Sequence, residues 1–144
     1  ILALETEIRE LRLGQRFRFR LDIKIGRNVA GATYDGEAQT ATLKLAKELP
    51  AGTADLRLEW SGEIAEKLRG LYRSTRPGER YAATQFEAAD ARRAFPCFDE
   101  PEFKATFKVV LTHDPQLAAI ANMPIESERA DGGMKQTTFR ETPV

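Results

Sequence analysis

An amide and a carboxylate stand two residues apart in the segment "TQFEAADARRAFPCFDEP", residues 84–101, as Gln85 and Glu87. On an extended segment, residues two apart point to the same side, so both side chains would face one space. The amide can donate and accept hydrogen bonds, whereas an ionised carboxylate only accepts them. This combination suits a ligand that carries a cation or an amine. The alternative is structural, with an exposed Glu87 that caps a helix beginning near Ala88.

Charged residues of both signs follow this pair. Arg92 and Arg93 precede Asp99 and Glu100 in the same segment, and the simplest interpretation is a set of ion pairs that brace a compact turn. Cys97 stands between two apolar residues. This position favours a buried structural thiol over a nucleophile.

Other catalytic chemistry has little support in the sequence. The chain contains one histidine, His113, and one cysteine. A catalytic zinc usually takes three protein ligands, often two histidines and a carboxylate, so we expect this chain to bind no zinc. His113 precedes Asp114-Pro115, a position typical of an exposed turn histidine. A Ser-His-Asp triad would need this same histidine, and no nucleophile-elbow motif accompanies it.

The composition is that of an ordinary globular domain, with 144 residues, of which 42% are hydrophobic and 31% charged. This length is enough to bury a core. The 22 Lys and Arg balance the 22 Asp and Glu, so no net field attracts nucleic acid or an anionic membrane. No apolar run approaches the roughly 20 residues that span a bilayer.

Alternation of apolar and polar residues predicts a mostly β chain. The clearest strand is 16–25, "RFRFRLDIKI", and Asp35-Gly36 marks a hairpin before the next strand. Further strands are expected at 40–45, 54–60, 79–86, 103–111, 117–122 and 134–140. Two short helical segments are expected at 62–72 and 87–95, the second ending before Pro96. Many short strands between turns indicate an all-β antiparallel sandwich.

Three stretches of the sequence resemble one protein family. They are "LRGLYRS" (68–74), "RYAATQFEAADARRAFPCFDEPEFKATFKVVL" (80–111) and "AIANMPIES" (119–127). Together they are similar to the N-terminal β-domain of the aminopeptidase N family of zinc metallopeptidases, which includes puromycin-sensitive and antigen-processing aminopeptidases. The resemblance runs from about Glu48 to the C-terminus, and the strand at 16–25 has no clear counterpart in it.

The resemblance implies a fold and a site. In the family this domain is a saddle-like antiparallel β-structure packed on a thermolysin-like catalytic domain, with the "TQFE" segment reaching the active-site cleft. By that match Gln85 would line the pocket for the first side chain of a peptide substrate. Glu87 would hold the free α-amino group, alongside a glutamate of the family's GAMEN motif. Arg92, Arg93 and Asp99 would give structural support to the loop.

The same resemblance implies zinc in the full-length enzyme, bound by an HExxH motif with a downstream glutamate. This chain contains neither GAMEN nor HExxH. We therefore expect residues 1–144 to be a single β-domain, a fragment of a larger aminopeptidase that is inactive alone and able to self-associate through an open strand edge. Its expected partners are the catalytic domain and the substrate N-terminus. The alternative is a non-catalytic β-sandwich interaction module, such as the family's transcription-machinery relative.

Overall fold

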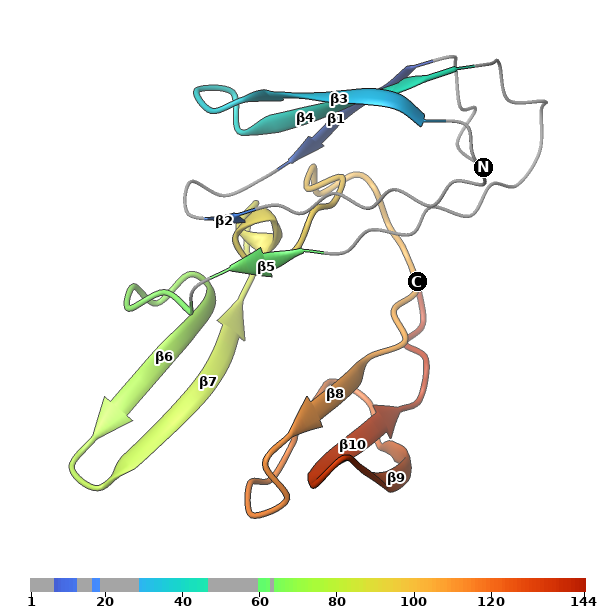
Figure 1. The fold of residues 1–144 in the computed structure, drawn as a ribbon. Coiled ribbons are helices and arrows are strands. Elements are labelled where there is room, and N and C mark those ends of the chain that lie inside the picture. The colour runs from blue at the N-terminus through green and yellow to red at the C-terminus, as the bar shows by residue number, and fades with distance from the viewer. Residues whose placement is uncertain (1–6, 13–16, 19–28, 47–59, 63) are drawn as a thin grey trace. The chain divides into compact units, whose positions relative to one another are not determined.

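Strands make up nearly all of the regular structure (Figure 1). The computed structural model describes residues 7–12, 17–18, 29–46, 60–62 and 64–144. Within them every named strand pair is antiparallel, and the one helical element is the short 3₁₀ turn η1 (Ala91–Arg93). None of these described residues forms a helix of the length and hydropathy that a membrane span requires. The all-β antiparallel class is therefore confirmed.

The chain divides into two compact units, Ile1–Pro101 and Glu102–Val144. Each unit has its own strand pairings. The organisation of residues 1–144 as a single domain stays a prediction.

The first sheet of unit 1 places β4 (Thr40–Leu45) between β1 (Glu7–Arg12) and β3 (Val29–Asp35). Alternate apolar side chains of β4 are buried, and Lys44 between two of them is exposed. The buried ones are Ala41, Leu43 and Leu45. This period-two burial confirms the strand predicted at 40–45.

Asp35 closes the hairpin between β3 and β4. Its Oδ1 accepts the backbone N–H groups of Glu37 and Ala38, each at 2.9 Å. An aspartate that binds the backbone two residues ahead is a common way to fix a turn. The hairpin predicted at Asp35-Gly36 is therefore confirmed.

A second hairpin of unit 1 leads into the segment that carries Gln85 and Glu87. It consists of β6 (Gly70–Arg76) and β7 (Glu79–Gln85), which pair in continuous register along their full length. Gly78 turns the chain with a φ of 83°, in the left-handed region that glycine adopts most readily. The strand predicted at 79–86 is confirmed.

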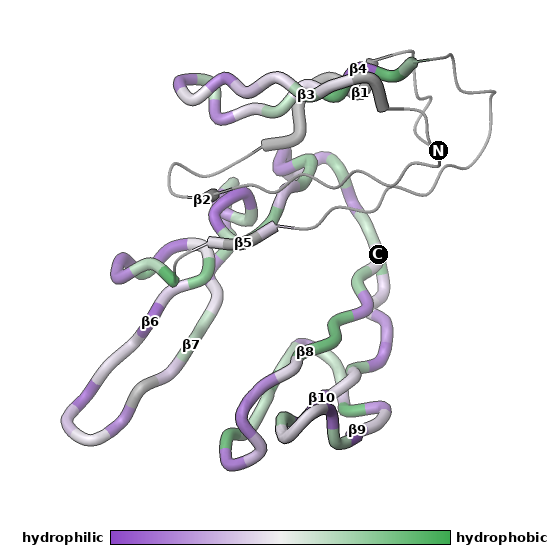
Figure 2. The backbone as a smooth tube through the Cα atoms, in the orientation of Figure 1, coloured by the Kyte–Doolittle hydropathy of each residue, from purple (hydrophilic) through white to green (hydrophobic). Residues whose placement is uncertain are grey.

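A polar cluster holds the tip of this hairpin. Arg76 donates to the carboxylate of Glu79, which also accepts the hydroxyl hydrogen of Tyr81. The guanidinium carbon of Arg76 lies 5.7 Å from the centre of the Tyr81 ring, within reach of a cation–π contact. Both hydrogen bonds lower the pKa of Glu79, and the bond from Tyr81 has the larger effect. Figure 2 shows the hydrophilic colours of this tip.

The helix predicted at 62–72 is wrong. Residues 66–69 form a bend, and Gly70 begins β6 with a φ of 66°, far from the negative φ of a right-handed helix. Ala65 makes a bridge to Tyr72 instead. The amphipathic spacing of this segment gives only a weak preference for a helix, and the pairing of β6 with β7 outweighs that preference.

Two predicted strands fall largely outside the described residues. Of the strand predicted at 16–25, the structure describes Phe17 and Arg18, which form β2 (Phe17–Arg18) and pair with β5 (Ser61–Gly62). Of the strand predicted at 54–60, it describes Trp60 alone, which is not in a strand.

Unit 2 contains a three-stranded sheet in the order β8 (Val110–His113), β10 (Met134–Phe139) and β9 (Ile125–Asp131). Gly132 and Gly133, both with positive φ, join β9 to β10. β10 confirms the strand predicted at 134–140.

Two other strand predictions in unit 2 need correction. The strand expected at 103–111 begins only at Val110, the first residue of β8. The strand expected at 117–122 is wrong, because the next strand after β8 is β9, which begins at Ile125. Every residue of β9 is exposed, so no buried face marks it in the sequence. Backbone pairing with β10 across the two-glycine loop sets its register.

His113 ends β8 partly buried and hydrogen-bonded, and it is not the exposed turn histidine that the sequence suggests. Its Nδ1 lies 2.9 Å from the carbonyl oxygen of Asp114, and its Nε2 lies 3.0 Å from Oγ1 of Thr137. Thr137 is fully buried and donates to Glu128 at 3.0 Å. These contacts give the histidine a structural role in the unit 2 sheet.

Candidate functional site

Gln85 and Glu87 are both exposed, at the point where β7 ends. Gln85 is the last residue of the strand, and Glu87 lies in the turn that follows. Phe86 between them is partly buried and packs edge-on against Phe95, with ring centres 5.7 Å apart and ring planes at 86°. The aromatic contact anchors the backbone of the segment, while its two polar neighbours remain accessible.

Trp60 extends this aromatic cluster. Its ring centre lies 6.5 Å from that of Phe95, and its Nε1–H donates to the carbonyl oxygen of Ala94 at 3.0 Å. Sequence reasoning missed this residue, because the contact joins positions 34 apart in the chain. The one signal in the sequence was that Trp60 is the single tryptophan, a side chain with a large apolar ring and one N–H donor.

The helix expected at 87–95 is reduced to η1, preceded by a turn at 87–90. The N-cap position of η1 belongs to Asp90, and no side chain makes a capping hydrogen bond there. Glu87 lies three residues before that position, so the alternative of a helix-capping Glu87 is wrong. Backbone hydrogen bonds form only single turns in the segment, such as those from Asp90 N–H to the Phe86 oxygen and from Phe95 N–H to the Ala91 oxygen, and aromatic and ionic contacts accompany them.

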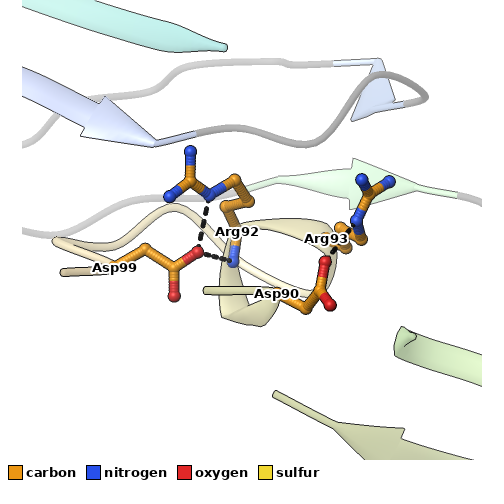
Figure 3. A network of polar contacts seen from close by, with 4 residues as sticks. All are labelled: Asp90, Arg92, Arg93 and Asp99. Atoms are coloured by element: carbon orange, nitrogen blue, oxygen red, sulfur yellow. Dashed lines mark hydrogen bonds and ion pairs between the residues drawn. The ribbon is translucent and has the colours of Figure 1, made fainter. Parts of the chain in front are cut away.

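Two ion pairs brace the segment (Figure 3). Arg92 Nε lies 2.6 Å from Asp99 Oδ2, which also accepts the backbone N–H of Arg92 at 3.2 Å. The side chains are only 17% and 5% exposed. Arg93 Nε lies 2.6 Å from Asp90 Oδ1. Arg93 thus pairs with Asp90, the N-cap residue of η1. The sequence had suggested Asp99 or Glu100 as its acidic partner.

Cys97 lies inside the braced segment and is partly buried. Burial is the main cause that raises the pKa of its thiol to about 12, and the charge of Asp99 adds to the effect while Arg92 opposes it. A thiol that stays protonated is a poor nucleophile. The structure therefore favours the structural interpretation of Cys97.

We expect Cys97, the single cysteine of the chain, to react slowly with iodoacetamide at about pH 8 in the folded protein. Because its folded pKa is raised, the stability that the neutral thiol contributes is present below the ordinary value of 9.0 and is lost as the pH rises toward about 12. Mass spectrometry of the alkylated fraction over time measures the rate. Equal rates in buffer and in denaturant would contradict the burial of the thiol.

The residues that the structure describes contain no donor set that fits a catalytic zinc. Among the described residues, no group of three or more His, Cys, Asp and Glu side chains is arranged to hold a metal ion. The single histidine of the sequence already contacts Asp114 and Thr137.

The sequence matches a protein-family model described as the peptidase M1 N-terminal domain, over residues 7–144. The match thus begins well before Glu48, where the motif resemblance starts. Among curated proteins, the chain is 44% identical over 112 residues to aminopeptidase M1 of Arabidopsis thaliana, covering 75% of this chain and 13% of that protein. It is 41% identical over 118 residues to the puromycin-sensitive aminopeptidase of Caenorhabditis elegans, covering 77% and 12%. The chain thus spans about an eighth of these two relatives.

Solved structures give a similar result. An M1 zinc metallopeptidase from Deinococcus radiodurans superposes with a TM-score of 0.70 at 26% identity, over 94% of this chain and 31% of that one. A mutant of that enzyme was crystallised bound to a Tyr-Ser-Ala substrate, and it superposes with the same TM-score of 0.70.

Proposed function

Because the chain belongs to the peptidase M1 N-terminal domain family, we propose that it is the substrate-binding N-terminal domain of a zinc aminopeptidase that removes N-terminal residues from peptides. The observation that carries the proposal is the exposed pair Gln85 and Glu87 on an anchored segment at the end of β7. The curated relatives that match this chain are aminopeptidases, which agrees with the proposal.

Glu87 is the residue that we assign to the substrate's amino group. A protonated α-amine is a donor of charge-assisted hydrogen bonds, and a carboxylate is its natural acceptor. Glu87 is exposed, so its carboxylate is available to a ligand. An exopeptidase must distinguish a free amino terminus from an internal peptide bond, and this contact provides that distinction.

Gln85 is assigned to the pocket for the first side chain of the substrate. Its amide can donate as well as accept, so it can meet polar side chains of either kind. It lies two residues from Glu87, at the last position of β7. A substrate held by its amine at Glu87 would thus present its first side chain near this amide.

The bond-breaking chemistry belongs outside this chain. Since the described residues do not fit a zinc ion, we place the metal and its activated water in a thermolysin-like catalytic domain of the same protein. The small share of each relative that this chain covers, 13% for aminopeptidase M1, is consistent with such a partner domain. The 144-residue chain alone is accordingly proposed to be inactive.

Blocking the substrate's amine tests the proposal on the intact protein. We expect α-N-acetylation of an alanyl-anilide or of a tripeptide to lower kcat/KM at least about 100-fold. The acetylated nitrogen carries no charge, so the carboxylate of Glu87 would be left without its partner. Removal of metal with a chelator should abolish turnover of the free-amine substrate, and added zinc should restore it.

Each outcome of that assay has a distinct meaning. Equal cleavage of the acetylated and free substrates would contradict amine recognition. Absence of turnover with either substrate, in the presence of added zinc, would favour the non-catalytic interaction module. Amine-dependent, zinc-dependent turnover supports the aminopeptidase.

A further inference from the structure

Gly70 occupies a position that no other residue could fill without a shift of its neighbours. An added Cβ would lie 2.3 Å from the Cβ of Arg93, and 3.2 Å from the carbonyl oxygen of Asp90. The Arg93 Cβ is bonded directly to the backbone and cannot rotate away as the end of a flexible side chain would, so η1 itself would have to move. The two backbone atoms met, the Asp90 oxygen and the Arg93 carbonyl carbon, lie at 3.2 Å and would need to give way only slightly.

The same residue is also paired with the candidate site. Gly70 is the register partner of Gln85 at the end of the β6–β7 ladder. Its φ of 66° turns the chain into β6 at this point. One glycine therefore contacts both sides of the segment, Gln85 where the segment begins and Asp90 and Arg93 where η1 follows.

Glu87 lies between these two contacts. Its position depends on where β7 ends and on where η1 begins, because it lies two positions after Gln85, the last residue of β7, and four positions before Ala91, the first residue of η1. We propose that Gly70 is a positioning residue for substrate recognition, which holds η1 close against β6 and so fixes the place of Gln85 and Glu87. The proposal rests on the function proposed above.

Gly70→Ala in the intact protein tests this inference, with Gly78→Ala as the matched control. Both glycines have positive φ, 66° and 83°, and both belong to the same hairpin. An added Cβ at Gly78 meets nothing within 4 Å, so the control carries the backbone strain without the collision. We expect Gly70→Ala to lower kcat/KM for free-amine substrates by on the order of tenfold to 100-fold, and Gly78→Ala to change it less than about twofold.

A purely structural role is separated by adding Gly70→Ala to the variant Gln85→Ala/Glu87→Ala. If Gly70 acts through Gln85 and Glu87, the triple variant should be no slower than Gln85→Ala/Glu87→Ala, since residues that work as a unit are not additive. Multiplying losses would mean that Gly70 acts elsewhere, and would overturn the proposal. Equal effects of the Gly70 and Gly78 variants would overturn it too.

A second pair of variants covers the case in which Gly70→Ala does not fold. Arg93→Gly removes the Cβ that the new methyl group meets, whereas Arg93→Ala keeps it. Both lose the ion pair with Asp90. We expect Gly70→Ala/Arg93→Gly to recover folded protein and kcat/KM toward the level of Arg93→Gly, and Gly70→Ala/Arg93→Ala not to recover. The same recovery in both would overturn the proposed contact.

The failure of this inference is distinguishable from failure of the proposed function. If Glu87→Ala lowers kcat/KM but Gly70→Ala acts no more strongly than its control, the positioning role is wrong and the amine site stands. If Glu87→Ala itself leaves kcat/KM unchanged, the assignment of Glu87 to the substrate's amine is wrong, and the observation that carries the proposed function is lost.

Discussion

Replacing Glu87 with alanine in the intact protein is expected to lower kcat/KM for free-amine substrates by roughly tenfold to 150-fold. The loss corresponds to one charge-assisted hydrogen bond of about 1.5–3 kcal/mol, converted at about 1.36 kcal/mol per decade. Steady-state kinetics on an aminoacyl-anilide measures it. Zinc content and melting temperature should be nearly unchanged, because Glu87 is exposed and does not occupy the N-cap position of η1.

Gln85→Ala is the matched control for this experiment. It is exposed like Glu87 and lies two residues away, but it is assigned to the side-chain pocket. It should change the ranking of amino-terminal side chains and leave the requirement for a free amine intact. An unchanged kcat/KM of Glu87→Ala, together with a lowered melting temperature, would remove Glu87 from the binding site.

Replacing Asp99 with alanine is expected to cost about 3 kcal/mol of unfolding free energy, at the lower end of the range for breaking a buried ion pair. The Arg92 side chain is only 17% exposed, so its charge would be left largely without compensation. The backbone N–H of Arg92 would lose its acceptor as well. Urea denaturation of the variant and the parent measures the difference as a shift of midpoint at constant slope.

Glu66→Ala provides the comparison for a pair at the surface. Glu66 and Arg73 form an ion pair whose side chains are 79% and 46% exposed, and such pairs contribute about 0–1 kcal/mol. The Asp99 variant should also expose Cys97 to alkylation earlier in the urea series, since the thiol lies in the braced segment. Equal midpoint shifts for the two variants would mean that the Arg92–Asp99 pair does not stabilise the fold.

The sequence predicts best where a repeating pattern coincides with burial. β4 is the clear case, because Ala41, Leu43 and Leu45 are buried alternately, and the Asp35 turn has a local mechanism. Alternation of apolar and polar residues fails to locate a strand that is held by backbone hydrogen bonds to its neighbour without a buried face. β9 has no buried residue, so its position could not be found from alternation.

The segment around the candidate site shows the same limit. Its residue types indicated an amine ligand, and Arg92 and Asp99 were recognisable as partners from their charges. The contact of Gly70 with Arg93, and the bond from Trp60 to Ala94, join residues 23 and 34 positions apart. Neither contact has a local signature, because tertiary packing creates both.

The indole of Trp60 has a spectroscopic consequence. It is the only tryptophan of the chain, so its emission arises from one place within these residues. That place is an aromatic cluster in which Trp60 contacts Phe95, and Phe95 contacts Phe86. Phe86 is the residue between Gln85 and Glu87. Selective excitation of the isolated chain therefore reports, through the Trp60 emission, a change in the packing next to the candidate site without any attached dye.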